Sequence, residues 1–306
     1  MSFLTRLYKI YLENSIDFTH ENEDIFFSFN TSVYETITSE YNDKYEYIYP
    51  EITLAKNLLS NEKFGRLDLQ TNYKVNKYET NKFSNFLIND LDWNFKELNH
   101  LSGFNSKIFG NIKNVNYETK NVDIYKKDTT SEIYGALGYL SEIDFRKKTG
   151  QSDHLLTPKV LFRYAPGGMR KETDGTRLSP SSAFSLDRID NINNFETGLS
   201  STFGFDYNFK KNEKEFDFSI AQIINEKENK DMASKTSLDE KISDLVGKSS
   251  YKVNNNMTLN YNFSVDQNYN ELNYSEIGTK FDFEPLKINF NYLLNFMKRQ
   301  IGSQWS

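Results

Sequence analysis

The sequence predicts an all-β fold, an antiparallel up-and-down transmembrane β-barrel of about 14 strands. Three observations predict it: apolar and polar residues alternate over many short segments, aromatic residues are abundant although mean hydropathy is low, and connections alternate in length. The clearest segment is Met257–Val265, where every second residue is apolar and Thr, Asn or Ser fill the positions between. Such a period of two is typical of a strand with one apolar and one polar face.

The composition separates a membrane barrel from a disordered chain. Hydrophobic residues make up 37% of the chain and aromatic residues 15%, and mean hydropathy is −0.70. Soluble domains carry roughly 45–50% apolar residues when glycine is counted, and disordered chains are poor in aromatic residues. A barrel needs apolar residues only on its lipid face, with aromatic residues at both membrane interfaces. A soluble all-β protein with one solvated sheet face remains the alternative.

Charge and cysteine content exclude several other classes. The net charge is −6 and the signs are interspersed, so the basic stripe of a nucleic-acid-binding protein is absent. The chain has no cysteine and therefore no disulfide framework. No apolar run approaches the roughly 18–20 residues of a transmembrane helix, whereas about 9–11 residues suffice for a barrel strand. The segment Met1–Ile10 lacks the apolar core and cleavage site of a signal peptide.

In the first half of the chain, residues 1–20 are compatible with a short helix followed by a strand, and we favour a strand. Further strands are predicted over Asp24–Thr36, Tyr45–Lys56, Phe64–Lys77, Phe86–Leu98, Phe104–Tyr117 and Ile133–Phe145. Pro50 lies inside one of them. Because proline cannot donate to a ladder, Pro50 indicates a sheet edge, a bulge or a local opening.

The second half continues the series. Strands are predicted over Leu155–Tyr164, Phe195–Phe209, Phe216–Asn225, Leu245–Val253, Met257–Asp266, Leu272–Phe283 and Leu286–Phe296. Short connections are expected at Lys210–Lys214, Asn254–Asn256 and Glu284–Pro285, and long ones at 118–130, 166–194 and 227–242. If strands run up and down, all the long connections fall on one rim, which is the pattern of outer-membrane barrels.

Several short segments in the second half resemble those of one family. They are Leu156-Thr-Pro-Lys-Val160, Ala183-Phe-Ser-Leu-Asp-Arg188, Phe195-Glu-Thr-Gly-Leu199, Ser243-Asp-Leu-Val-Gly247 and Leu259-Asn-Tyr-Asn-Phe-Ser-Val-Asp266. In order and spacing, residues 155–295 resemble the C-terminal barrel of the lipopolysaccharide (LPS) assembly protein family LptD, also called OstA or Imp. The first 150 residues are compatible with earlier strands, so we expect 1–306 to be a single, incomplete barrel domain.

The resemblance implies a function. The family lies in the outer membrane of Gram-negative bacteria, receives LPS from a periplasmic bridge and inserts it into the outer leaflet through a lateral seam between the first and last strands. A lipoprotein, LptE, plugs the barrel. The resemblance implies no enzymatic activity and no cofactor. Family members also have a signal peptide, a periplasmic jelly roll, interdomain cysteines and about twice as many strands. The resemblance therefore implies that this chain is a fragment and that its strands form part of a larger barrel.

Candidate lipid contacts cluster in and beside the loop at 166–194. They are Arg163, Arg170, Lys171, Arg177, Asp187 and Arg188. Guanidinium groups suit the geometry of lipid phosphates, although a solvated loop folded into the lumen explains the same residues and is favoured. Glu196, Asp206 and Asp266 lie on polar strand positions and predict a hydrophilic lumen.

The alternatives differ in chemistry. None of His20, His100 and His154 has a metal-binding spacing, and no G-x-S-x-G nucleophile motif occurs, which disfavours an outer-membrane hydrolase. A generic pore or surface β-barrel without LPS transport is the main alternative. It would conduct ions without crosslinking LPS, whereas an LptD-like chain would crosslink LPS from its lumen.

Overall fold

The computed structural model describes residues 11–36, 45–79, 81–100, 103–126, 128–173, 175–189 and 191–295. Within these ranges the protein is all-β, apart from the single-turn 3-10 helices η1 (Ser182–Phe184) and η2 (Ser234–Thr236). The described part of the chain holds no helix with the length and hydropathy to cross a membrane. Residues 1–10, where the first predicted strand begins, and 296, where the last ends, lie outside the described residues.

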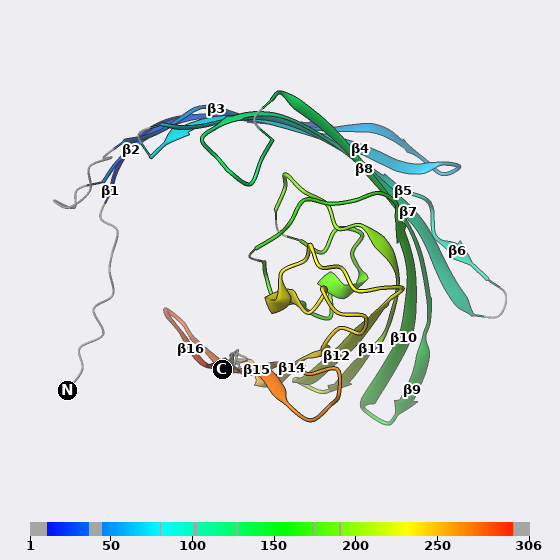
Figure 1. The fold of residues 1–306 in the computed structure, drawn as a ribbon. Helices are drawn as coiled ribbons and strands as arrows, with labels where there is room; N and C mark the ends of the chain where they lie inside the picture. The colour runs from blue at the N-terminus through cyan, green and yellow to red at the C-terminus, as the bar shows by residue number, and fades with distance from the viewer. Residues whose placement is uncertain are drawn as a thin grey trace, which may run out of the picture. The chain divides into compact units, whose positions relative to one another are not determined.

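The strands match the predicted series closely (Figure 1). They are β1 (Tyr11–Glu21), β2 (Ile25–Thr36), β3 (Tyr45–Asn61), β4 (Gly65–Tyr78), β5 (Lys82–Asn94), β6 (Leu98–Asn99), β7 (Phe104–Lys120), β8 (Thr130–Ile143), β9 (Phe145–Thr149), β10 (Ser152–Ala165), β11 (Gly198–Lys211), β12 (Lys214–Asn225), β13 (Leu245–Asn254), β14 (Met257–Val265), β15 (Leu272–Phe283) and β16 (Leu286–Asn295).

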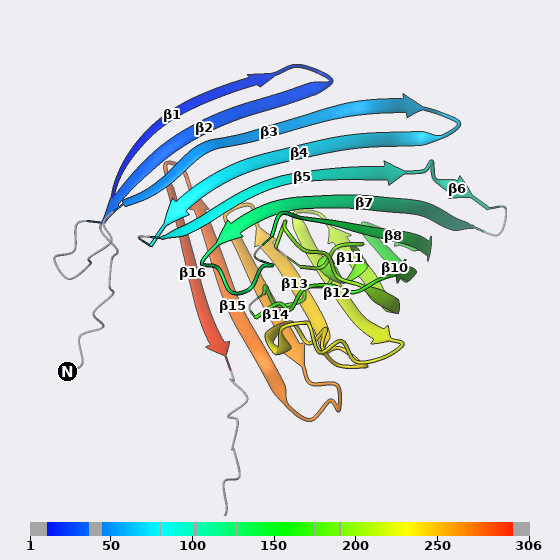
Figure 2. The same ribbon diagram turned by 45° about the horizontal axis from the view of Figure 1, so that its top comes forward.

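The sheet follows chain order, as Figure 2 shows. Of its 16 strands, β6 and β9 lie off the main path, which leaves 14 strands from β1 to β16 in sequence order. The strand pairs with a defined register are antiparallel, for example β1 with β2 and β15 with β16. The up-and-down antiparallel prediction and its strand number are therefore confirmed.

The boundaries differ from the predicted ones at a few places. Strands β7 and β8 extend into the polar segment, so the predicted loop 118–130 shortens to 121–129. Of the sheet edge, bulge or local opening predicted at Pro50, the structure shows a bulge, because the register of β3 shifts between Ile48 and Glu51 against β4. The opposite neighbour, β2, shows a matching shift between Asn30 and Ser32.

By internal contacts the chain divides into two units, each described here by itself. Unit 1 contains residues 1–96, 109–135 and 192–195, and unit 2 contains 97–108, 136–191 and 196–306. Within unit 2 the connections alternate in length as predicted. The short ones are 212–213, 255–256 and 284–285, whereas β12 and β13 are separated by 226–244.

Unit 1 presents one polar sheet face, most clearly on β4. Lys74 bonds to Glu51 of β3 at 3.0 Å, and Asn72 accepts a hydrogen bond from Thr53 at 3.0 Å. The odd-numbered positions of β4, such as Leu69 and Tyr73, belong to the opposite face, since side chains alternate along a strand.

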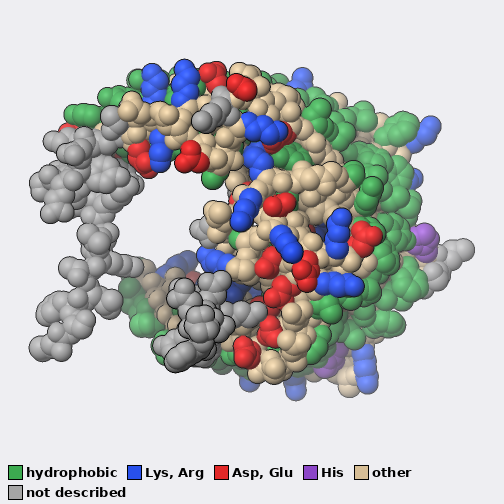
Figure 3. Space-filling view, viewed as in Figure 1, with side chains coloured by type: hydrophobic (Ala, Val, Ile, Leu, Met, Phe, Trp, Pro, Cys, Tyr) green, Lys and Arg blue, Asp and Glu red, His purple; other side chains and the backbone are tan. Residues whose placement is uncertain are grey.

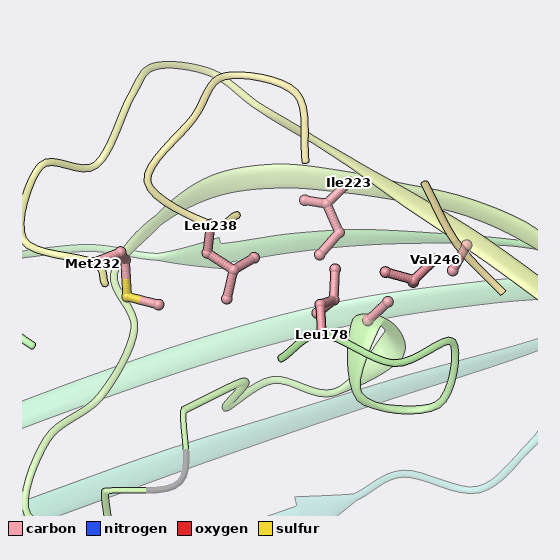
Figure 4. Packing of buried hydrophobic residues seen from close by; sticks show 7 residues of the cluster. Leu178, Ile223, Met232, Leu238 and Val246 are labelled. Carbon is pink, nitrogen blue, oxygen red and sulfur yellow. The ribbon is translucent and has the colours of Figure 1, made fainter. Parts of the chain in front are cut away.

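Unit 2 buries its own core on the polar side of its sheet. Long connections fold against β11–β13, and residues from both of them join strand residues in one apolar cluster (Figure 4). The cluster comprises Leu178, Ala183, Ala221, Ile223, Met232, Leu238 and Val246. The opposite face of β10–β12 is apolar and exposed, and hydrophobic side chains gather there in Figure 3.

Candidate functional site

A buried ionic cluster ties the connection after β10 to the sheet of unit 2. Arg188 forms a two-pronged ion pair with the Glu196 carboxylate, with Nε 2.6 Å from Oε2. Arg163, near the end of β10, donates through Nε to the backbone oxygen of Leu186 at 2.6 Å and through Nη2 to that of Glu196. Arg163, Arg188 and Glu196 are exposed by only 1%, 5% and 2%, so this cluster excludes bulk water.

Charge complementarity holds the cluster together. Burial by itself would raise the pKa of the Glu196 carboxyl, but the positive charges of Arg188 and Arg163 outweigh that effect and hold its pKa below the ordinary value of 4.5. Arg188 also donates to the Ser200 hydroxyl at 3.1 Å. Because Ser200 pairs with Arg163 across β10 and β11, the sheet register itself aligns the cluster.

The phrase Ala183–Arg188 supplies the loop side of this anchor. The backbone oxygen of Ala183 accepts a hydrogen bond from the Thr202 hydroxyl of β11 at 2.9 Å, and the Ala183 side chain is fully buried. The Phe184 ring lies 4.6 Å from Nζ of Lys159, a residue of the phrase Leu156–Val160. Phrases that are distant in sequence thus meet at one place in unit 2.

The phrase Ser243–Gly247 anchors the second long connection. The Ser243 hydroxyl accepts a hydrogen bond from the backbone N–H of Ile223 at 2.9 Å. The Asp244 carboxylate accepts hydrogen bonds from Ser264 at 2.6 Å and from Asn273 at 2.9 Å. These bonds hold the connection against β12, β14 and β15.

The six predicted contact residues do not share one environment. Arg163 and Arg188 are buried in the anchor, whereas Lys171 is exposed and Arg170 and Asp187 are half-buried. The Arg177 guanidinium lies 4.9 Å from the Tyr274 ring.

The predicted polar strand positions also divide. Lys159 pairs with Asp206, which lies on the polar side of β11 as expected. Glu196 precedes β11 instead of lying within it, and Asp266 follows β14, where its carboxylate accepts from the backbone N–H of Asn268 at 3.2 Å. Glu196 leaves the strand because its carboxylate reaches the Arg188 guanidinium, and Gly198, at φ +128°, admits the turn into β11.

A cavity of about 510 Å³ lies between the ends of the two long connections in unit 2. Backbone at Gly167, Gly168 and Gly198 forms part of its wall, and charged residues of both signs between Glu226 and Asp231 form another part. No group of acidic or histidine residues suited to a metal ion occurs among the described residues. The wall also contains apolar residues, among them Met169, Leu199 and Leu238, so the cavity offers both polar and apolar contacts.

Unit 1 contains a buried cluster that the sequence analysis missed. Lys113 of β7 lies 3.4 Å from Asp90 of β5, 3.4 Å from the backbone oxygen of Asn194 and 5.4 Å from the Phe195 ring centroid. Asn111 donates to Asp90 at 2.9 Å. The only sequence signal is the period-two spacing of polar residues on each strand, which does not reveal which residues face one another.

An antiparallel up-and-down sheet with one apolar, aromatic-rich face, one polar face and long connections at one edge defines the class of outer-membrane β-barrel proteins. The sequence profile of the family described as LPS transport system D, LptD, matches residues 8–296. The chain therefore belongs to the LptD family, and the match includes the N-terminal strands as well as the region 155–295. Comparison with curated protein sequences gives no match.

Membership has direct consequences. LptD proteins form a family of transport and assembly proteins of the outer membrane, not of enzymes. Membership of this family implies that the substrate is LPS and that the function is LPS transport at the outer membrane.

Proposed function

We propose that this chain forms the lipid-inserting wall of an LptD-type translocon, which delivers LPS to the outer leaflet through a lateral seam. The family match carries the proposal. The division of the sheet into a polar and an apolar face supports it, because LPS has a polar sugar and phosphate part and an acyl part. The polar part would travel along the polar face while the acyl chains remain in the bilayer.

The polar face of unit 1 is the best-suited path for the sugars and phosphates. Side chains there are accessible, since Lys74 and Glu51 keep 39% and 42% of their side-chain surface exposed. In unit 2 the chain's own connections cover the polar face of the sheet, and Arg163 on that face is only 1% exposed. An LptE-like plug lipoprotein, and LPS arriving from a periplasmic bridge, would accordingly contact the polar face of unit 1.

The candidate loop residues take two roles in this proposal. Arg163, Arg188 and Asp187 support the loop structure, because the first two are committed to the buried anchor. Arg170, Lys171 and Arg177 would meet lipid phosphates, since these cations lie in the connection itself and outside the anchor.

The seam is proposed at the edge of β1 that has no neighbour among the described strands, since β1 stands at one end of their order. Strand β1 pairs with β2 over its described length, and its apolar face carries Ile16 and Phe18, exposed by 68% and 57%. Photoreactive residues along β1 should capture LPS in transit more strongly than residues at matching depth on β5, which is paired on both sides.

Site-specific photocrosslinking in cells tests the transport path. Gln70 lies on the polar face of β4, in the half of the strand nearer the short connection 62–64, and Leu69 lies beside it on the apolar face. In this half the apolar face would meet the phospholipid leaflet, so LPS should crosslink to a probe at Gln70 and not at Leu69. A generic pore would conduct ions and crosslink LPS at neither position, and that result would refute the proposal.

A further inference from the structure

Three lysines of unit 2 lie on the lipid-facing side of the sheet at its short-turn edge. Lys147 of β9 pairs with His154 of β10. Lys211 of β11 pairs with Ser152 of β10 and with Lys214 of β12. Directly paired residues share a face, and residues two apart on a strand share it too. Lys147, Lys211 and Lys214, called here the outward lysine strip, therefore occupy one face.

An aromatic belt borders the strip on that same face. The His154 ring lies 4.9 Å from the Phe209 ring between centroids, and its Nδ1 lies 2.9 Å from the Tyr207 hydroxyl. The belt continues across β12 and β13, with centroids 6.3 Å apart for Tyr207 and Phe216 and 6.4 Å for Phe216 and Tyr251. Such belts mark the level at which membrane hydrocarbon gives way to headgroups.

Two basic residues of the opposite face, Arg146 and Lys210, form ion pairs, whereas the lysines of the strip form none within the described residues. Arg146 pairs with Asp153, and Lys210 pairs with Glu215 at 2.6 Å. The strip lysines are all exposed, and within the described residues none of them forms an ion pair. The strip therefore presents three exposed positive charges on the membrane side of this edge.

The turn lengths assign the strip to one leaflet. Strands β9 and β10 are joined through 150–151, and β11 and β12 through 212–213. Short turns of outer-membrane barrels face the periplasm. The leaflet on that side consists of phospholipids, some of them anionic, and Lys side chains attract such headgroups.

We propose that the outward lysine strip binds the phosphate headgroups of anionic phospholipids in the periplasmic leaflet. Lipid A phosphates offer the same chemistry from the opposite leaflet, but the turn lengths favour phospholipid. The binding would hold this edge of unit 2 at a fixed depth in the membrane, and it does not depend on the proposed transport route.

Spin-labelled lipids test the proposal with the full chain in phosphatidylcholine bilayers at low salt. A lysine near an anionic surface increases association on the order of fivefold. The motionally restricted fraction should therefore favour spin-labelled phosphatidylglycerol over spin-labelled phosphatidylcholine, and the preference should decline at high salt.

Matched variants separate the strip from general charge. The triple variant K147Q/K211Q/K214Q should lose most of the preference, whereas K148Q/K210Q/K252Q, which removes the same charge from the opposite face, should keep it. Arginine at the three strip positions keeps the positive charge and should preserve the preference. That result would show that the loss in the glutamine variant comes from the lost charge and not from a folding defect at these positions. Equal losses in the two glutamine variants, or none in the first, would overturn the proposal. A preference for spin-labelled lipid A instead of phosphatidylglycerol would overturn the leaflet assignment.

Discussion

At the residue scale, Glu196 compensates two guanidinium groups in a place that excludes water. Its carboxylate binds Arg188 directly, and its backbone oxygen accepts from Arg163. A buried ion pair of this kind is weak evidence for net stability, because desolvation offsets the attraction. Removing one member is costly, since the remaining charges stay buried. The cluster therefore specifies where the connection after β10 docks.

The variant E196Q should destabilise unit 2 by about 3–5 kcal/mol, because Arg188 and Arg163 lose their buried counter-charge. The matched control is E215Q, which breaks the exposed pair with Lys210 and should cost about 1 kcal/mol or less. Urea unfolding in micelles measures both changes. Equal costs for the two variants would contradict the structural role of the anchor.

Acidic pH should release the connection after β10 from the sheet. The pKa of Glu196 in the folded protein lies below its ordinary value of 4.5, so the ionised carboxylate stabilises the fold above that pH. This contribution is lost as the pH falls through the lowered pKa. Hydrogen exchange of residues 175–189, corrected for intrinsic rates, should show protection at neutral pH that declines in this acidic range. In E196Q the pH dependence of this segment should be largely absent.

At the scale of elements, the packing between paired strands depends on small residues as well as on large ones. Gly247 of β13 pairs with Phe263 of β14, whose ring covers the glycine. An aromatic side chain over a cross-strand glycine shields the backbone and fixes the register. This contact gives a physical reason for the glycine that ends the phrase Ser243–Gly247.

The variant G247A should be destabilising, because the new Cβ would lie 2.1 Å from Cζ of Phe263. Overpacking of this kind costs about 1–3 kcal/mol. The control G168A adds the same methyl group where nothing lies within 4 Å, and it should be nearly neutral. Adding F263L to G247A should restore part of the loss. Thermal unfolding in micelles distinguishes these cases, and additive effects of the two substitutions would argue against the contact.

The two long connections of unit 2 should loosen together. Leu238, exposed by 1%, belongs to the cluster that also contains Leu178 from the other connection. Truncation in L238A leaves a cavity and should cost about 2–5 kcal/mol. Trypsin should then cleave after Lys227 and after Arg170 faster than in the parent. I224A removes a similar side chain from the outward face of β12, the strand before this connection, and should leave both cleavage rates unchanged.

At the scale of the whole molecule, local pattern predicts the strands but not their mutual contacts. The alternation in Met257–Val265 is a property of one segment, and the strand is found there. Glu196 also fits the alternation of the predicted strand Phe195–Phe209, yet β11 begins at Gly198 because Arg188 engages the carboxylate. The Lys113–Asp90 pair depends on the register between β5 and β7, which neither strand encodes by itself.

The exposed apolar face determines how the protein behaves in solution. Large side chains on it are exposed by 68% at Ile16, 74% at Ile133 and 63% at Tyr292. Soluble monomers rarely expose contiguous apolar patches beyond a few hundred Å², so the chain should aggregate in buffer and disperse in detergent. Sedimentation with and without detergent measures this, and a faster-migrating band before boiling on a denaturing gel would indicate a folded barrel wall in the dispersed sample. A monodisperse, strand-rich chain without detergent would instead favour a water-soluble sheet, because its apolar face would then have to be covered by protein and not by lipid.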